Sequence, residues 1–238
     1  DVDFETGLKY KLPILCPVDE QGKLTAEAGE RFAGMFVFDA NIPILKYLSE
    51  LNMLLGKENI KHQYAHCWRC KNPIIYRATP QWFASVDGFR DDALKAIAED
   101  VQWIPAWGQQ RIHNMVSERH DWCISRQRTW GVPIPVFYCA ECGEHLINDA
   151  TIESVANIFA KEGCDAWWAR PAEELLPAGT VCPKCGHTHF TKETDIMDVW
   201  FDSGVSHAAV LDTRDYLDSP ADLYLEGADQ YRGWFQSS

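Results

Sequence analysis

Three C-x-x-C pairs constrain this chain more than any other feature of its sequence. They begin at Cys67, Cys139 and Cys182 and account for six of the nine cysteines. Two thiolates at such a turn can bind one ion, and two turns together complete a tetrahedral zinc site. An odd cysteine count with this spacing favours metal ligation in a reducing compartment over a disulfide framework. We therefore expect a zinc protein of the cytoplasm.

Two of the pairs are each followed by glycine, Cys139 and Cys142 before Gly143, and Cys182 and Cys185 before Gly186. Together they predict a closed, structural Cys₄ zinc site that holds an insert at 139–190. Two alternatives are buried reduced cysteines and a redox pair, although the latter needs a thioredoxin-like context that is absent here. Reserve ligands stand nearby at His145, His187 and His189.

The third pair, Cys67 and Cys70, supplies only two ligands. A closed site needs two more. We expect them from His62 or His66, or from residues outside this chain.

Composition excludes several classes of protein. The 238 residues are 46% hydrophobic and contain no apolar run long enough to span a bilayer. The net charge of −13, from 22 basic and 35 acidic residues, argues against a non-specific nucleic-acid binder. The N-terminus has neither an initiator Met nor a basic or apolar leader. We expect no signal peptide and interpret the chain as a piece of a longer protein.

Apolar periodicity predicts helices over 39–56, 88–99 and 109–119, and a fourth that Thr151 caps and Gly163 ends. Short β-rich runs predict strands, and the mixture indicates an α/β fold. These runs cover 73–76, 122–125, 132–138, 198–202 and 223–225.

Five long stretches of sequence are far more specific than any single short motif. They are HCWRC at 66–70, TPQWF at 79–83, DWCISRQRTWGVPIP at 121–135, DVWFDSG at 198–204 and LEGADQYRGWF at 225–235. With them the chain resembles the isoleucyl-tRNA synthetases, class I enzymes that activate isoleucine with ATP. Valyl enzymes share a string like DWCISRQ, whereas the last string looks isoleucyl. The family's HIGH-type and KMSKS-type motifs and its anticodon-binding region are absent from these residues.

The resemblance implies a fold and a division of the chain. We expect part of a Rossmann-like class I catalytic domain, with a zinc-knuckle insert and the C-terminal part of an inserted editing domain. Residues 1–60 would belong to the editing domain and 61–120 to a return segment that holds Cys67 and Cys70. Catalytic-domain segments would cover 121–138 and 191–238, on either side of the insert at 139–190.

A helix beginning at Glu226 would place Glu226, Gln230 and Trp234 on one face. A carboxylate, an amide and an indole suit the ammonium, the carboxyl and the apolar side chain of an amino acid. The resemblance implies that these residues bind the aminoacyl-adenylate, and that Trp200, on the strand at 198–202, forms the opposite wall. The alternative is that both tryptophans belong to the core and Glu226 caps a helix.

Two further features follow from the resemblance and the charge pattern. A pocket for isoleucine cannot strongly exclude valine, as is known for this family, so hydrolytic editing is expected. The start DVDF at 1–4 matches the tail of the family's editing motif, in which Asp3 would bind the α-amino group. The basic and aromatic cluster at 126–130 suits a phosphate or a tRNA end, or else structural ion pairing.

The expected function is that of isoleucine–tRNA ligase with editing of Val-tRNA(Ile). Its partners would be isoleucine, ATP with Mg²⁺ and tRNA(Ile), with no membrane, and the full-length enzyme would be monomeric. Activation needs no protein nucleophile, so we assign binding residues and no catalytic residue. This chain alone should be inactive. The alternatives are a valyl-type synthetase and a non-catalytic zinc-ribbon module that binds nucleic acid.

Overall fold

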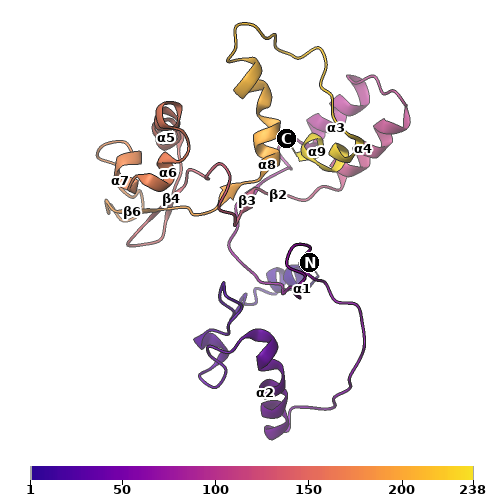
Figure 1. Cartoon of the computed structure of the whole chain (residues 1–238), viewed down its shortest axis with the longest axis vertical. Coiled ribbons are helices and arrows are strands. Elements are labelled where there is room, and N and C mark those ends of the chain that lie inside the picture. The colour runs from indigo at the N-terminus through magenta and orange to yellow at the C-terminus, as the bar shows by residue number, and fades with distance from the viewer. Residues whose placement is uncertain (1, 238) are drawn as a thin grey trace. The chain divides into compact units, whose positions relative to one another are not determined.

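The structure is a computed structural model that describes residues 2–237. The chain divides into two compact units, Asp1–Pro80 and Gln81–Ser238. Figure 1 colours the first unit from indigo to purple and the second from magenta to yellow. Among the described residues, no helix combines the length and the apolar character needed to cross a membrane.

The first unit contains α1 (Val2–Lys9), the short 3₁₀ helix η1 (Ala26–Ala28) and α2 (Val37–Glu50). The predicted helix at 39–56 is confirmed as α2, with different ends. Phe36 precedes its first turn, two residues before the predicted start, and Asn52 turns the chain away with a φ of 55°, before the predicted end. The run at 73–76 is not a strand, because only an isolated bridge pairs His66 with Pro73.

In its described part, Gln81 to Ser237, the second unit contains seven short strands, and every pair is antiparallel. The strands are β1 (Phe83–Ala84), β2 (Trp122–Cys123), β3 (Ser125–Arg126), β4 (Phe137–Cys139), β5 (His145–Leu146), β6 (Phe190–Lys192) and β7 (Ile196–Met197). They form sheets in the orders β1-β2, β3-β7 and β5-β4-β6. Within residues 2–237, none of these sheets is the parallel sheet that the resemblance implies.

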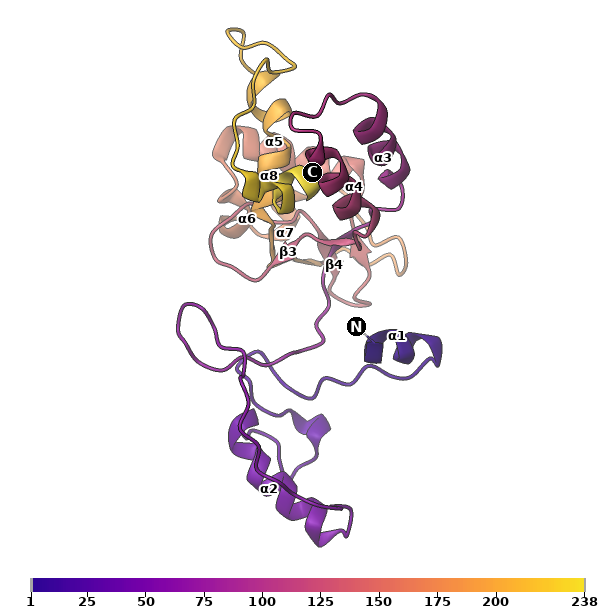
Figure 2. The same cartoon turned by 90° about the vertical axis from the view of Figure 1, so that its right-hand side faces the viewer.

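The helices of the second unit fall into two groups. The first is the hairpin of α3 (Arg90–Glu99) and α4 (Trp107–Ser117), against which α9 (Trp234–Ser237) packs; α9 also contacts α8 (Val199–Gly204) and the 3₁₀ helix η3 (Ala228–Arg232). The π-helical η2 (His207–Leu211) follows α8 in the chain. The second is α5 (Asp149–Glu162), α6 (Ala166–Ala169) and α7 (Ala172–Leu175), which Figures 1 and 2 show gathered near β4.

The segment 137–190 contains a hydrophobic core, and we call this segment the insert. Phe137 on β4 and Trp167 on α6 are fully buried, with ring centroids 5.0 Å apart. The predicted fourth helix is confirmed as α5, although Asn148 is its N-cap: its side chain accepts from the Thr151 N–H, and the Thr151 hydroxyl accepts from the Asn148 N–H. Gly163 ends the helix with a φ of 81°. A small sheet and three helices therefore pack directly beside the cysteine pairs.

Candidate metal centre and amino-acid site

The Cys139–Cys142 turn and the Cys182–Cys185 turn have the same backbone geometry, and we call them the two knuckles. In each, the N–H of the first cysteine donates over 2.8 Å to the carbonyl five residues on. The N–H of the residue four positions after that cysteine donates to the carbonyl of the same cysteine over 2.9 Å. That fourth position is Gly143 or Gly186, with a φ of 70° or 75°, a conformation that glycine adopts without strain.

The knuckles bring four thiols together. The Sγ atoms of Cys139, Cys142, Cys182 and Cys185 all lie within 4.8 Å of one another. Two of the pairs across the knuckles are closer, 3.5 Å for Cys139 with Cys185 and 3.6 Å for Cys142 with Cys182. A tetrahedral zinc ion with bonds of about 2.3 Å needs sulfur atoms about 3.8 Å apart. The predicted four-cysteine set therefore converges with a geometry that fits zinc.

The protonation of these thiols also suits a cation. Burial opposes ionisation of Cys182, but N–H groups of Cys185 and Lys184 and neighbouring thiols lower its pKa to about 6. The pKa of Cys185 is raised to about 12, because hydrogen bonding to Cys142 and burial outweigh the favourable N–H of His187. Several adjacent thiolates repel one another unless a cation neutralises them. The surroundings thus favour ionisation of Cys182, and a bound cation would favour ionisation of Cys185.

The Cys67–Cys70 turn repeats the backbone pattern of the knuckles. The Cys67 N–H donates to the Asn72 carbonyl over 2.8 Å, and the Lys71 N–H donates to the Cys67 carbonyl over 2.9 Å. Lys71 takes the glycine position with a φ of 63°. Hydrogen bonds from Cys70 and Arg69 lower the pKa of Cys67. The turn is thus shaped as a knuckle.

No described side chain completes a site at this turn. Within residues 2–237, the four-cysteine set is the one group of three or more His, Cys, Asp or Glu side chains close enough to share an ion. His62 and His66, the expected ligands, instead place Nδ1 3.0 Å from the Gln63 carbonyl and 2.8 Å from the Tyr64 carbonyl. Among the described residues, Cys67 and Cys70 therefore have no third ligand close enough to share an ion.

Glu226, Gln230 and Trp234 come together, although not on one continuous helix. The prediction of one continuous helix from Glu226 is wrong, because η3 ends at Arg232, Gly233 interrupts the helix, and α9 starts at Trp234. Trp234 Nε1 donates to Glu226 Oε1 over 3.1 Å, and the Trp234 N–H reaches Gln230 Oε1 over 3.4 Å. Trp234 therefore contacts both other residues, Glu226 through its indole and Gln230 through its backbone N–H.

Trp200 lies on α8 and not on a strand, which corrects the predicted strand at 198–202. Asp198 begins the helix, because its Oδ1 accepts from the Trp200 N–H over 3.1 Å. α8 packs against α9, so Trp200 and Trp234 lie on adjoining elements. The run at 223–225 is likewise not a strand, and its chain is irregular.

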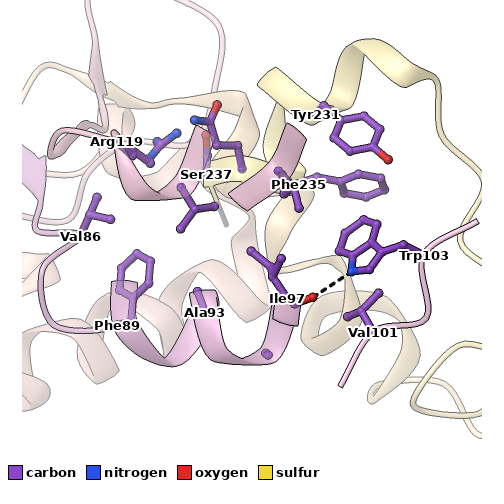
Figure 3. Close-up of a pocket in the computed structure, with 14 residues that line it drawn as sticks. Val86, Phe89, Ala93, Ile97, Val101, Trp103, Arg119, Tyr231, Phe235 and Ser237 are labelled. Carbon is purple, nitrogen blue, oxygen red and sulfur yellow. Dashed lines mark hydrogen bonds between the residues drawn. The ribbon is translucent and has the colours of Figure 1, made fainter. Parts of the chain in front are cut away.

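α9 is held against the helical hairpin, and this fixes the start of the helix at Trp234. Gln236 Nε2 donates to the Met115 carbonyl of α4 over 2.8 Å. Beside this contact lies a cavity of about 570 Å³ between α3, α4 and α9. Figure 3 shows Trp103, Phe235 and Tyr231 at one end of the cavity and Arg119 near the other, with Trp103 donating to the Ile97 carbonyl. The walls are mostly apolar and close around the short helix.

The remaining predicted site residues are Asp3 and the basic cluster at 126–130. Asp3 is exposed in the first turn of α1, and Asp1 lies outside the described residues. In the basic cluster, Arg126 Nη2 forms an ion pair of 2.5 Å with Asp198, which is 5% exposed. Structural ion pairing thus accounts for Arg126, whereas Arg128 and Trp130 are exposed.

One polar network was not predicted. Glu193 Oε2 accepts from Trp82 Nε1 over 2.9 Å and from the Tyr138 hydroxyl over 2.5 Å, while its carbonyl accepts from Trp167. Burial and this carboxylate raise the pKa of Tyr138 to about 12. The network ties the start of the second unit to the insert. Tyr138 and Glu193 lie 56 and 111 residues from Trp82 in the sequence, so local sequence patterns do not predict the network.

Comparison with known proteins identifies the family of this chain. The family model of the class I tRNA synthetases for I, L, M and V matches residues 6–238. The chain therefore belongs to the class I tRNA synthetases.

Within this class, the chain is similar to proteins that share one name. Over 236 residues, 99% of this chain, it is 62% identical to "Isoleucine--tRNA ligase" of Caldicellulosiruptor saccharolyticus. It is 61% identical to the protein of the same name in Moorella thermoacetica and 63% identical to that of Desulfitobacterium hafniense, each over 99% of the chain. In each case it spans about a quarter of the relative's length, 25%.

Proposed function

We propose that this chain is part of an isoleucine–tRNA ligase, which activates isoleucine with ATP and transfers it to tRNA(Ile). The observation that carries the proposal is the contact of Trp234 with Glu226 and Gln230, on residues that the resemblance assigns to the aminoacyl-adenylate. The high identity to isoleucine–tRNA ligases supports it.

Each residue has a role that its chemistry allows. The Glu226 carboxylate would bind the ammonium group of isoleucine, and the Gln230 amide would bind its carboxyl group or the adenylate. Trp234 and Trp200 would enclose the sec-butyl side chain. The substrate carboxylate then attacks the α-phosphorus of ATP and releases pyrophosphate, so the enzyme acts by positioning its substrates. Mg²⁺ accompanies ATP and neutralises phosphate charge.

The metal centres complete the proposal. Zinc held by the four thiolates at Cys139, Cys142, Cys182 and Cys185 would stabilise the insert and leave no open position for catalysis. Cys67 and Cys70 would supply half of a second zinc site. The Sγ distances support the four-cysteine assignment, and the backbone geometry of the turns supports both.

The domain assignments remain part of the same proposal. Residues 1–60 would end an editing domain in which Asp3 binds the amino group of Val-tRNA(Ile), and 61–120 would return the chain to the Rossmann-like catalytic domain. The catalytic segments at 121–138 and 191–238 would flank the insert at 139–190. The whole enzyme would act as a monomer in the cytoplasm.

Amino-acid-dependent ATP–pyrophosphate exchange on the full-length protein tests the proposal. Isoleucine, valine and leucine are compared at matched concentrations in zinc-loaded protein. We expect exchange to be strongest with isoleucine and weaker but measurable with valine. A preference for valine would assign the protein to the valyl type. No exchange with any of the three would leave a zinc-ribbon module that binds nucleic acid.

A further inference from the structure

The segment that leads to Glu226 has no regular structure of its own. Residues 212–227, between η2 and η3, form neither a helix nor a strand. The ladder of backbone hydrogen bonds that fixes a helix or a sheet is therefore missing here, and the position of the segment depends on side-chain contacts. Tyr224, two residues before Glu226, makes such contacts with both its ring and its hydroxyl group.

The ring of Tyr224 packs against α9. Its centroid lies 5.0 Å from that of Trp234, with the two planes at 61°, and 6.5 Å from that of Phe235, with the planes at 72°. Aromatic pairs in this edge-to-face range attract one another beyond the surface that they bury. The Trp234 indole is thus held at its Nε1 by Glu226 and on its ring by Tyr224.

The hydroxyl of Tyr224 reaches a different element. It lies 2.8 Å from the Ser206 hydroxyl, within hydrogen-bond distance. Ser206 has helical backbone angles, φ −60° and ψ −28°, and stands between the end of α8 and the start of η2. α8 carries Trp200. A single side chain therefore contacts Trp234 through its ring and, through its hydroxyl, the helical stretch that carries Trp200.

We propose that Tyr224 is a positioning residue for the isoleucine site and that, with Ser206, it sets the separation between Trp200 and Trp234. The inference rests on the proposed function, in which these two tryptophans enclose the sec-butyl side chain. Tyr224 acts through Trp234 and needs no contact with the substrate.

The separation of the two walls bears on the choice between isoleucine and valine. The two substrates differ by one methylene, whose contacts are the basis of discrimination, as is known for this family. Dispersion contacts weaken steeply when a gap of even 0.5–1 Å opens. Valine leaves part of the pocket unfilled in any case, so looser walls cost isoleucine more than valine. The bond between the two hydroxyls therefore favours isoleucine.

The first test measures kcat/KM for isoleucine and for valine in pyrophosphate exchange on the full-length, zinc-loaded protein. Tyr224→Phe keeps the ring and removes the hydroxyl, and Ser206→Ala removes its partner. We expect each variant to lower the ratio of isoleucine to valine kcat/KM about fivefold, mainly through a higher KM for isoleucine. Ser206→Thr, which keeps a hydroxyl, should retain the wild-type ratio. So should the matched control Tyr216→Phe, an exposed tyrosine of the same segment.

The double variant tests whether the two hydroxyls act as one unit. Tyr224→Phe combined with Ser206→Ala should lower the ratio no further than either change alone, because both remove the same hydrogen bond. Additive losses would refute the hydroxyl pair. Equal losses for isoleucine and valine would also refute the inference, since they indicate general support of the fold and not control of the pocket width.

One comparison separates this inference from the proposed function. Isoleucine-dependent exchange that is absent in the wild-type protein would refute the ligase, and the inference with it, whatever the variants do. Wild-type exchange together with an unchanged isoleucine-to-valine ratio in both Tyr224→Phe and Ser206→Ala would refute the positioning role alone.

Discussion

At the scale of single residues, the hydrogen bond from Trp234 Nε1 to Glu226 is the contact with the clearest consequence. Trp234→Phe keeps an aromatic ring but removes the donor, so the Glu226 carboxylate loses a fixed partner. A hydrogen bond of this kind contributes about 1 kcal/mol. We predict that the KM for isoleucine in pyrophosphate exchange on the full-length protein rises about fivefold, with a smaller change in kcat.

The control for this prediction is Trp107→Phe at the exposed start of α4, which should leave the KM unchanged. An isoleucine KM that stays at the wild-type value in Trp234→Phe would show that the indole N–H does not help to place Glu226. The indole would then serve only as an apolar wall.

Asp202 predicts a pH dependence of stability. Burial, and secondly the negative charge of Asp198, raise its pKa above the ordinary value of 3.8. The folded state thus binds this proton more tightly than the unfolded chain, and Asp202 lowers the free energy of unfolding as pH rises from 3.8 through the raised pKa. Asp202→Asn should therefore be more stable than the wild type at pH 7, and the difference should shrink towards acid.

Denaturant unfolding of the zinc-loaded chain at a series of pH values measures this difference. The exposed Asp215→Asn change provides the comparison for loss of one charge elsewhere. Equal stabilities of Asp202→Asn and the wild type throughout the range would contradict the raised pKa.

At the scale of elements, the knuckle glycines test how the metal centre is built. A Cβ added at Gly143 or Gly186 meets nothing within 4 Å, so only their positive φ opposes a side chain. An L-residue in this conformation costs about 1–2 kcal/mol. We predict that Gly186→Ala weakens zinc binding about five- to thirtyfold, measured by competition with a chelator. Gly88→Ala, also in open space but without a positive φ, should have no effect.

The elements also show what local patterns can predict. The helices α3, α4 and α5 follow from apolar spacing, because each has an apolar stripe, which is buried on α4 and α5 and half-buried on α3. The run at 198–202 has strand-like composition, yet the Asp198 side chain caps a helix there and overrides that propensity. The run at 223–225 finds no strand partner among the described residues, and an isolated extended segment is not a strand.

Local sequence patterns also predict only part of the candidate sites. The cysteine spacing predicted the four-thiol cluster, since the knuckle is a local structure and each ligand pair is set by its own turn. The residues at 226, 230 and 234 were predicted as a group, but the break at Gly233 was not. The Glu193 network joins residues far apart in the chain, and only the tertiary fold brings them together.

At the scale of the whole molecule, the two units differ in how well they are packed. In residues 2–80, the buried apolar side chains are Phe32 and Ala40, whereas the second unit has a continuous core around Phe137 and Trp167. Apolar burial is the dominant source of folding free energy, so the first unit should be only weakly stable in this chain.

Hydrogen–deuterium exchange can measure that difference element by element. We predict that, in the zinc-loaded 238-residue chain, amides of α2 exchange at least about tenfold faster than amides of α5, because local opening needs less free energy where little apolar surface is buried. A chelator should then raise exchange in α5 and leave α3 and α4 unchanged, since the four thiols support only the insert. Equal protection of α2 and α5 with zinc bound would mean that buried apolar area does not govern the stability of the first unit.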